Sequence, residues 1–550
     1  MAVWHSNYPK GIPENIDVKN YSSVVDLVLK TVDTYSEKIA FSNMGIDLTY
    51  AEVDHLSDYF ASFLQNQCQL KPGDRIALQM PNLLQYPIAL FGAIKAGLIV
   101  VNTNPLYTER EMEHQFTDAK VKAVVILANF ACHLEKILPK TQIEHVIITE
   151  IGDLFPPVKK FVVNNAVKYI KKMVPSYKIK NAHKFIDVLE KGKEKPVQIH
   201  RAQIEDIAFL QYTGGTTGVA KGAMLTHGNI LANMNQIFSW MSPKFENGKE
   251  IIITPLPLYH IFSLTVNCLA LMCYGGQNIL ITNPRDIPDF VKTLKKYPFT
   301  VMTGVNTLYN ALLNNKEFHQ VDFSTAKLSV AGAMALQDNV AKRWYEVTGT
   351  KVIEGYGLTE ASPVVCCNPV DDTEKRGTIG MPLPNTEVKL IDADGNIVPE
   401  GESGELCVRG PQVMKGYWEK PEETSMILKD SWLHTGDVAI MDESGYFKIV
   451  DRIKDMILVS GFNVYPNEIE DVIANHPAVL EVAAVGVPNE KSGEVVKIFV
   501  VKKAPVTEEE LREFAKKSLT AYKVPRLVEF RDDLPKTNVG KILRRELRGQ

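Results

Sequence analysis

Apolar and polar positions follow two different periods along the first half of the chain. Residues 49–64, T-Y-A-E-V-D-H-L-S-D-Y-F-A-S-F-L, repeat apolar side chains at helical spacing and begin with threonine, which favours a helix N-cap. Runs of β-branched and apolar residues predict strands at 75–80, 98–101, 121–127 and 145–149. Because helical and strand patterns alternate from about residue 22 to residue 281, they predict an α/β fold with largely parallel sheets.

Three later segments share one design, a short apolar strand that runs into glycine. They are V-M-T-G-V at 301–305, L-S-V-A-G-A at 328–333 and K-V-I-E-G-Y-G at 351–357. Ligands of open α/β sheets bind outside the carboxyl ends of the strands, so we expect these ends to converge on one pocket. The apolar run at 87–101 predicts a buried helix followed by a strand, since Lys95 and two glycines interrupt it.

The pattern changes from Gly377 onward. Turn signals such as D-A-D-G-N and D-E-S-G-Y crowd together, which indicates hairpins rather than βαβ units. After Asp451 the periods predict a compact order of helix, strand and helix. We therefore divide the chain into a large domain of α/β subdomains at 1–451, with a hairpin-rich, barrel-like part at 377–451, a hinge at 452–456, and a small mobile α+β domain at 457–550.

Composition narrows the functional classes. The 550 residues include 61 basic and 65 acidic side chains, a net charge of −4 that gives no indication of a nucleic-acid partner. The 7 cysteines contain no C-x-x-C pair, which argues against a disulfide framework or a zinc site and favours a reducing compartment. The N-terminus has no apolar secretory segment. We expect a cytoplasmic location, and the oligomeric state stays open, with a homodimer as one alternative.

A lysine-rich segment at 159–174 allows two interpretations. No acid occurs between Leu154 and Ile186. In a continuous helix one face would carry Val163, Ala166, Val167, Ile170 and Val174, with lysines beside it. Such a helix either docks on an anionic membrane surface, here the cytoplasmic face of the inner membrane, or packs its apolar face on its own domain. The second interpretation is the commoner one for amphipathic helices.

The segment Y-T-G-G-T-T-G-V-A-K-G-A-M, residues 212–224, follows a predicted strand and packs glycines, threonines and one lysine together. Glycines let backbone N–H groups converge on a phosphate, hydroxyls add donors and lysine neutralises charge. The segment departs from the Walker A pattern, because Lys221 stands three residues after Gly218 and is followed by Gly222. Taken alone, such a loop is more often a plain turn.

Three further motifs carry polar groups suited to a nucleotide. E-G-Y-G-L-T-E at 354–360 places an aromatic ring for a purine, a hydroxyl for a phosphate and a carboxylate for Mg²⁺. W-L-H-T-G-D ends in Asp437, an acid suited to the two hydroxyls of a ribose, and K-T-N-V-G-K places Lys541 after a glycine turn. Each motif alone is equally well a strand end, a turn or a solvated charge.

Together and in this order, the four motifs resemble those of the AMP-forming acyl/aryl-CoA synthetases, the adenylate-forming superfamily, from about Tyr50 to Leu547. Residues 430–455, L-P-L-Y-H-I-F at 256–262 and V-S-G-F-N-V-Y-P-N-E-I-E at 459–470 are most similar to bacterial long-chain fatty-acid–CoA ligases. One departure is A-G-A-M at 331–334, where such enzymes often carry another glycine.

The resemblance implies a two-step reaction. ATP and Mg²⁺ convert a fatty acid to acyl-AMP with release of pyrophosphate, and CoA then takes the acyl group and releases AMP. Two enzyme alternatives stay open, a fatty acyl-AMP ligase that loads a carrier protein and a CoA ligase for an aryl or other acid. A catalytically silent fatty-acid- or nucleotide-binding protein is a third, which the intact Glu360, Lys541 and phosphate loop argue against.

The resemblance also implies residue roles. The residues implied to bind ATP are Thr213, Gly214, Gly215, Thr216, Thr217, Gly218 and Lys221 at the phosphates, Gly332, Ala333, Glu354, Gly355, Tyr356 and Gly357 at adenine, and Asp437 and Arg452 at ribose. Thr359 contacts the α-phosphate, Glu360 holds Mg²⁺ with Thr213, and Lys541 reaches the carboxylate and the α-phosphate.

For the second step, Lys454 is implied as the hinge, and Gly461 then swings toward the pantetheine tunnel. The implied walls of the acyl tunnel are His260, Ile261, Leu264, Gly304 and Val305. We interpret His260 as a wall or gate rather than a base, since a carboxylic acid is already ionised at neutral pH.

Overall fold

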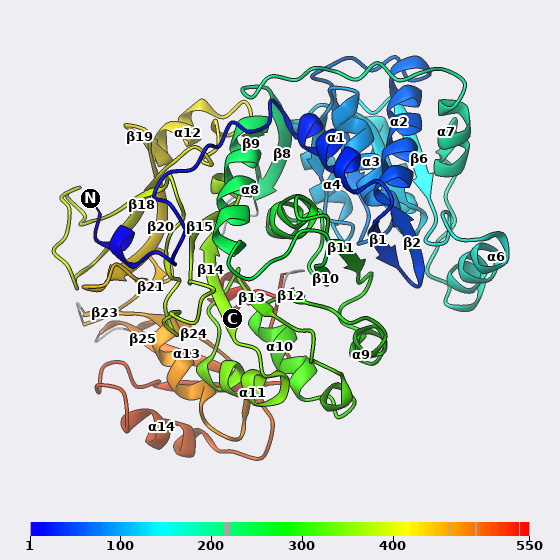
Figure 1. The fold of residues 1–550 in the computed structure, drawn as a ribbon. Helices are drawn as coiled ribbons and strands as arrows, with labels where there is room; N and C mark the ends of the chain where they lie inside the picture. Colours follow the sequence, from blue (N-terminus) through cyan, green and yellow to red (C-terminus); the bar gives the residue numbers. More distant parts are fainter. Residues whose placement is uncertain (1, 214–219, 461, 490–491, 538–539, 549–550) are drawn as a thin grey trace.

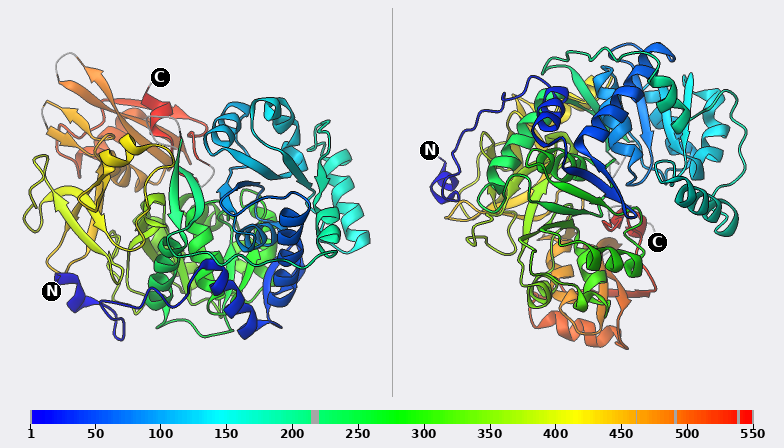
Figure 2. Two further views of the ribbon diagram at one scale, coloured as in Figure 1. Left: turned by 90° about the horizontal axis from the view of Figure 1, so that it is seen from above. Right: turned by 45° about the vertical axis from the view of Figure 1, so that its right-hand side comes forward.

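A computed structural model describes residues 2–213, 220–460, 462–489, 492–537 and 540–548 of the chain. Its four sheets and surrounding helices form an α/β architecture, as predicted, with the C-terminal unit at one side of the molecule (Figures 1 and 2). Within these ranges, no helix combines the length and the apolar character needed to cross a membrane.

Two large, mainly parallel sheets make up most of the fold. The nine-stranded sheet has the order β16 (Met381–Pro382), β15 (Val364–Cys367), β14 (Val352–Gly357), β13 (Leu328–Ala331), β12 (Val301–Gly304), β10 (Ile251–Thr254), β11 (Gln277–Leu280), β1 (Ile39–Asn43) and β2 (Ile46–Thr49). The seven-stranded sheet has the order β7 (His183–Lys184), β6 (His145–Thr149), β5 (Val121–Leu127), β3 (Arg75–Gln79), β4 (Ile99–Asn102), β8 (Ile207–Thr213) and β9 (Lys221–Thr226).

Two smaller sheets follow in the sequence. The first has the order β17 (Glu387–Ile391), β18 (Ser403–Arg409), β20 (Trp432–Met441) and β19 (Leu428–Lys429), and β21 (Phe447–Arg452) also pairs with β20. The second has the order β23 (Phe462–Val464), β22 (Ile457–Val459), β25 (Gly493–Lys502) and β24 (Val479–Asn489), and β26 (Leu527–Arg531) pairs with β25. The predicted hairpins after Gly377 are thus present as antiparallel strands.

Helices cover both large sheets and complete the C-terminal unit (Figure 1). The α-helices are α1 (Val24–Tyr35), α2 (Tyr50–Asn66), α3 (Gln85–Lys95), α4 (Glu109–Asp118), α5 (Ala131–Ile137), α6 (Pro157–Asn165), α7 (Phe185–Gly192), α8 (His227–Met241), α9 (Ile287–Lys296), α10 (Asn306–Leu313), α11 (Asp338–Thr348), α12 (Pro421–Ile427), α13 (Pro466–Ala474), α14 (Glu508–Lys516) and α15 (Arg544–Arg548). A single apolar core joins the two large sheets and the first small one, whereas the residues from Ile457 onward form apolar clusters of their own.

Helix α2 begins where the sequence predicts. The Thr49 side chain accepts the Glu52 N–H at 3.1 Å and Glu52 accepts the Thr49 N–H at 2.8 Å, so both end groups are satisfied. The predicted buried helix and strand are α3 and β4. Lys95 at the end of α3 is 1% exposed, and Asp54 and Asp58 of α2 neutralise it at 2.6 Å each.

The three glycine-tipped strands lie side by side, as expected. β12, β13 and β14 are parallel neighbours in the nine-stranded sheet, with Gly304 paired to Ala331 and Ala331 paired to Glu354. Parallel strands in register end at one edge, so the loops that follow them meet there.

The lysine-rich segment differs from the single helical face expected from its sequence. α6 ends at Asn165, the π-helix η4 (Ala166–Ile170) follows, and Lys172 has a φ of 52°. Val163 and Val174 pack against the protein, whereas Ile170 is 79% exposed. The prediction of one continuous apolar face over 163–174 is therefore wrong, because the wider π turn rotates Ile170 away from Val163.

Candidate active site

The predicted phosphate loop connects two antiparallel strands. Thr213 at the end of β8 pairs directly with Lys221 at the start of β9, so the hairpin brings both ends of the loop together. The Tyr212 hydroxyl anchors this end of β8 by donating to Asp118 at 2.6 Å. The five loop residues of the prediction, Gly214, Gly215, Thr216, Thr217 and Gly218, lie outside the described residues.

Tyr417 connects the base of this hairpin to Glu360. The Tyr417 hydroxyl donates to a Glu360 carboxylate oxygen at 2.6 Å, and the Lys221 Nζ lies 5.2 Å from the centre of the Tyr417 ring. Residues 416–418 pair with β9, because Met224 N–H donates to Gly416 and Trp418 N–H donates to Gly222, both at 2.8 Å. Glu360, in the short 3₁₀ helix η7 (Thr359–Ala361), is thereby held beside β9, at the base of the hairpin.

The family resemblance implies that Glu360 holds Mg²⁺ during adenylation. On that assignment we expect Tyr417→Phe to raise the Mg²⁺ concentration needed for half-maximal adenylation by about tenfold, since a hydrogen bond to a charged group contributes about 1.5–3 kcal/mol. The variant keeps the ring beside Lys221 and removes only the donor that orients Glu360. A Mg²⁺ titration of fatty-acid-dependent pyrophosphate release measures the effect. Tyr446→Phe, which removes a hydroxyl that donates to the Thr373 carbonyl, is the matched control. An unchanged titration for Tyr417→Phe would contradict this role.

The residues expected at adenine lie where β13 and β14 end. A Cβ on Gly357 would lie 2.0 Å from the Pro363 carbonyl, so that position has no room for a side chain. A Cβ on Gly332 would lie 3.0 Å from the Phe262 ring, which would have to shift. Ala333 adopts a φ of 66°, the left-handed region that favours glycine. Ala333 lies in the A-G-A-M segment, where the related enzymes often carry another glycine. Its backbone thus adopts a conformation that glycine would adopt without strain.

Glu354 supports two loops rather than standing free. Its carboxylate accepts the N–H groups of Leu336 at 3.2 Å and of Gly377 at 3.3 Å. Burial raises the pKa of Glu354 to about 7. Gly355, the next residue of β14, pairs with Cys367 of β15, which fixes the backbone at this end of the strand.

Tyr356, Asp437 and Arg452 form a connected set. The Tyr356 hydroxyl donates to one oxygen of Asp437 at 2.5 Å, and Arg452 Nε contacts the other at 3.0 Å. Asp437 and Arg452 are direct partners on β20 and β21, and Asp437 is 4% exposed. Burial, followed by the charge of Asp437, holds the pKa of Tyr356 far above its usual value. The hydroxyl therefore stays a neutral donor that fixes the orientation of the tyrosine ring.

Lys541 belongs to the C-terminal unit but lies against the large part of the chain. The preceding residue, Gly540, is so close to α10 that a Cβ there would lie 2.6 Å from Thr307 Oγ1. Burial, then the positive charge of Arg452, lowers the pKa of Lys541 to about 8. Burial, then the charge of Lys541, lowers the pKa of His260 to about 4, so the imidazole is neutral at pH 7.

Sequence comparison places this arrangement in a known family. The model for AMP-binding enzyme matches residues 28–418, and the model for AMP-binding enzyme C-terminal domain matches residues 468–541. The chain belongs to the AMP-binding enzyme family. The family resemblance read from the sequence motifs is confirmed.

Relatives and solved structures agree with this assignment over the full length. The chain is 58% identical to a long-chain-fatty-acid–CoA ligase of Escherichia coli O6:H1, covering 100% of this chain and 98% of the relative. It is 40% identical to a long-chain-fatty-acid–CoA ligase of Bacillus subtilis (strain 168), covering 99% and 97%. A crystal structure of an anthranilate CoA ligase in complex with anthranoyl-AMP superposes with a TM-score of 0.86 at 25% identity, covering 100% and 98%.

In this AMP-binding enzyme, the predicted hinge at 452–456 is held by two arginines of α15. Arg548 donates to the Lys454 carbonyl at 2.8 Å. Arg544 contacts Asp451 at 3.5 Å and Asp455 at 3.6 Å, one residue on each side of Lys454. Gly461, expected to act in the second step, lies outside the described residues.

The residues expected to line the acyl tunnel belong to neighbouring elements. Ile261, Leu264 and Val305 are buried, and a Cβ on Gly304 would lie 2.8 Å from the Tyr309 ring. Leu264 belongs to the π-helix η5 (Ser263–Ala270), which begins three residues after His260. Phe262, between His260 and η5, borders Gly332, so this segment adjoins the backbone that is expected to bind adenine.

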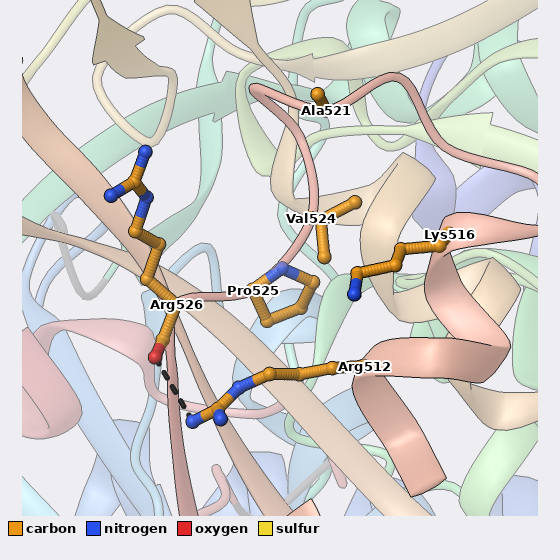
Figure 3. Close-up of a pocket in the computed structure, with 6 residues that line it drawn as sticks. All are labelled: Arg512, Lys516, Ala521, Val524, Pro525 and Arg526. Carbon is orange, nitrogen blue, oxygen red and sulfur yellow. Dashed lines mark hydrogen bonds between the residues drawn. The ribbon is translucent and has the colours of Figure 1, made fainter. Parts of the chain in front are cut away.

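One cavity adjoins the site and a second lies apart from it. One of about 240 Å³ lies between the large part and α13, with Glu354, Arg376 and Asp471 in its wall. The other, of about 370 Å³, lies within the C-terminal unit (Figure 3) and is lined by Arg512, Lys516, Ala521, Val524, Pro525 and Arg526. Arg512 donates to the Arg526 carbonyl at 3.1 Å. The second cavity contains none of the residues predicted for ATP or the acyl chain.

Proposed function

We propose that this enzyme is a long-chain fatty acid–CoA ligase that works in two half-reactions. A fatty acid and ATP give acyl-AMP and pyrophosphate, and CoA then takes the acyl group and releases AMP. The observation that carries the proposal is the 58% identity over the whole chain to a long-chain-fatty-acid–CoA ligase. The convergence of Glu360, Asp437 and Lys541 on the ends of the glycine-tipped strands supports the chemistry.

Charge is the obstacle in the first half-reaction, because a carboxylate is a weak nucleophile and is repelled by the triphosphate. Lys221 and the loop that begins at Thr213 are assigned to the β- and γ-phosphates, and Thr359 to the α-phosphate. Glu360 fits a Mg²⁺ ligand, since Tyr417 uses one carboxylate oxygen and leaves the second, and Thr213 adds a hydroxyl. Bound Mg²⁺ would neutralise phosphate charge and stabilise the leaving pyrophosphate.

Lys541 is assigned to the atoms that react. An ammonium group there attracts the incoming carboxylate and stabilises the charge that develops on the α-phosphate oxygens. The buried carboxylate of Asp437, held by Tyr356 and Arg452, is assigned to the ribose hydroxyls. Adenine is assigned to the backbone at 332–333 and 354–357.

The second half-reaction needs a different arrangement of the small domain. AMP is a good leaving group, so attack by the CoA thiol does not require Lys541. We assign residues 1–451 to the large domain, 452–456 to the hinge at Lys454, and 457–550 to the mobile domain. Rotation at a few hinge residues would withdraw Lys541 and bring Gly461 toward the CoA tunnel.

The pH profile of adenylation follows from Lys541. Its protonated form is the active one, and that form is lost as the pH rises through about 8. We expect kcat/KM for pyrophosphate release to fall by about tenfold per pH unit above this value. Arginine stays charged, so Lys541→Arg is expected to remove the fall. If Lys541→Arg keeps the native pH profile of kcat/KM, another group causes the fall.

Pyrophosphate release across a series of fatty acids, with and without CoA, tests the function. We expect sustained turnover with ATP, Mg²⁺, CoA and a long-chain acid. Release that stalls without CoA, and that CoA does not rescue, would indicate an acyl-AMP ligase awaiting a protein acceptor. Preference for an aromatic acid would indicate an aryl-CoA ligase.

The proposal also includes contact with an anionic membrane surface through residues 159–174, because a long-chain acid partitions into lipid.

A homodimer stays a prediction that sedimentation equilibrium tests.

A further inference from the structure

A thiol, an imidazole and a carboxylate meet on the first small sheet. Glu405 and Cys407 lie two residues apart on β18, and His434 on the neighbouring strand β20 is the direct partner of Cys407 (Figure 1). The His434 Nδ1 lies 3.0 Å from Glu405 Oε2 and 3.6 Å from Cys407 Sγ. One ligand atom of each residue lies within 4.8 Å of the other two. The three side chains therefore form one cluster on a single face of the sheet.

Cys407 lies on the polar face of β18, opposite the apolar core. Its neighbours Leu406 and Val408 belong to that core, whereas Cys407 is buried beside Glu405 and His434. The side chains of Glu405 and His434 are 20% and 17% exposed, so solvent reaches the cluster past them. The thiol is thus next to the two other ligand types of a zinc site.

The distances in the cluster are close to those of tetrahedral zinc. With Zn–S bonds of about 2.3 Å and Zn–N bonds of about 2.0 Å, sulfur and nitrogen ligands lie about 3.5 Å apart. The distance between Cys407 Sγ and His434 Nδ1 is already 3.6 Å. Nitrogen and oxygen ligands would lie about 3.4 Å apart, so Glu405 Oε2 has to move by only about 0.4 Å. Both contacts involve Nδ1, so a single cation bound there reaches both partners.

The backbone around the cluster holds two of the ligands in place. Glu405 Oε1 accepts the Gly436 N–H at 3.1 Å, which leaves Oε2 directed at His434. A hydrogen bond of this kind usually orients a carboxylate that binds a metal. The Thr435 hydroxyl donates to the Leu406 carbonyl at 2.7 Å and connects β20 to β18 between the ligands.

One other group of three possible metal ligands occurs in the part of the chain that the structure describes. It consists of Asp54, His55 and Asp58. Lys95 already neutralises both of its carboxylates at 2.6 Å, so a cation has no place there.

The residue spacing in the sequence gave no indication of the cluster. Cys407 and His434 are 27 positions apart, whereas the common zinc signatures place cysteines close together in pairs. Two lysines, Lys389 and Lys429, carry positive charge near Cys407. The Lys389 Nζ lies 4.5 Å from the centre of the Trp432 ring, where the ring face attracts it.

We propose that Glu405, Cys407 and His434 bind a divalent transition-metal cation of the zinc type. The Cys407 thiol releases its proton to solvent on binding, because the thiolate is the ligand. The thiolate and the Glu405 carboxylate then balance the two charges of the cation, and water takes the fourth position. Thiolate and imidazole ligands select zinc, whereas Mg²⁺ prefers oxygen ligands, so this site is separate from the one assigned to Mg²⁺.

The cation joins β18 to β20 shortly before Asp437, so it should stabilise the folded state of this sheet. The inference goes beyond the proposed ligase function and does not depend on it. Metal binding is measured without substrates, so a failure of the ligase function would not change the result.

Titration of the untagged full-length enzyme with Co²⁺, a spectroscopic substitute for Zn²⁺, tests the inference. We expect a single Co²⁺ per chain with a thiolate-to-metal charge-transfer band, and Zn²⁺ should displace it. Cys407→Ser should remove the band. Both Cys407→Ser and His434→Gln should weaken Zn²⁺ binding by more than the about 10–100-fold usually lost with a residue that only orients a ligand.

Cys132→Ser is the matched control, because Cys132 is a less buried cysteine on α5, outside the cluster. It should bind Co²⁺ as the native enzyme does. Zn²⁺ should also raise the Tm of the native enzyme and of this control, but not the Tm of Cys407→Ser.

Three results would overturn the proposal: no charge-transfer band in the native enzyme, a band that persists in Cys407→Ser, or a band that disappears in Cys132→Ser. The Tm without metal shows whether each variant is folded. If Cys407→Ser does not fold, His434→Gln decides the question, and native Zn²⁺ affinity in that variant would equally overturn the proposal.

Discussion

Replacing Lys541 by alanine is expected to lower acyl-AMP formation by about 10²–10³, the usual effect of removing one preorganised group that stabilises transition-state charge. Transfer of the acyl group from supplied acyl-AMP to CoA should keep its native rate. The substitution should affect only the first half-reaction, because AMP leaves in the second without help from the Lys541 ammonium group. Single-turnover pyrophosphate release measures the first step, and thioester formation from synthetic acyl-AMP measures the second.

Lys517→Ala is the matched control, because Lys517 is an exposed lysine of the same C-terminal unit. It should leave both half-reactions unchanged. Native-rate adenylation in Lys541→Ala would show that another cation serves the α-phosphate. Equal loss of both steps would indicate that the substitution damages the C-terminal unit rather than one step of the reaction.

The residue pattern predicted these helices and strands because interactions between neighbouring residues determine them. The strands 121–127 and 145–149 coincide with β5 and β6, and Thr49 caps α2 as expected from its position before an apolar period. The glycine-tipped strands end at one edge because parallel neighbours share a direction. In these cases the spacing of residues along the chain contains the information.

The rest depends on contacts between distant residues, which spacing does not reveal. Tyr417 meets Glu360 across 57 positions, and its surroundings, K-G-Y-W-E-K, indicate no more than a turn. Tyr356 was predicted to face a purine, which stays a prediction, whereas the hydrogen bond from its hydroxyl to Asp437, 81 positions away, was not predicted. The face of α6 was misassigned because a π turn cannot be read from an apolar period that assumes α-helical geometry throughout.

Arg544 also became visible only in the structure, and its removal should have the largest effect on stability. Its guanidinium contacts Glu470 at 2.6 Å, Asp451 at 3.5 Å and Asp455 at 3.6 Å. Arg544→Ala would leave these three carboxylates without their shared cation. Breaking a buried ion pair from one side costs about 3–5 kcal/mol, because the remaining charge stays desolvated. Hydrogen exchange of the β24 and β25 amides measures the free energy of unfolding of the C-terminal unit.

Two variants make this prediction specific. Arg526→Ala, at an exposed position of the same C-terminal unit, should change the same free energy of unfolding by less than about 0.5 kcal/mol. Arg544→Lys keeps the charge but loses the planar fork, so it should recover only part of the loss. Equal protection factors in Arg544→Ala and the native enzyme would show that the three acids find other partners.

The same cluster gives the loss of stability a pH dependence with a definite sign. Burial raises the pKa of Asp451 to about 6 in the folded enzyme, against an ordinary 3.8, and Arg544 opposes that rise. A raised acid contributes stability below its unfolded pKa and loses it as the pH rises through the folded one. Without Arg544 the pKa of Asp451 in the folded enzyme rises further. Ionising Asp451 then lowers the free energy of unfolding by more, and this loss continues to grow to a higher pH. Arg544→Ala should therefore lose more stability at about pH 8 than at about pH 5. Because Asp451 and Asp455 flank Lys454, the variant should also loosen the hinge. A loss of packing alone would lower the free energy of unfolding equally at both pH values. Such an equal loss would contradict the electrostatic account.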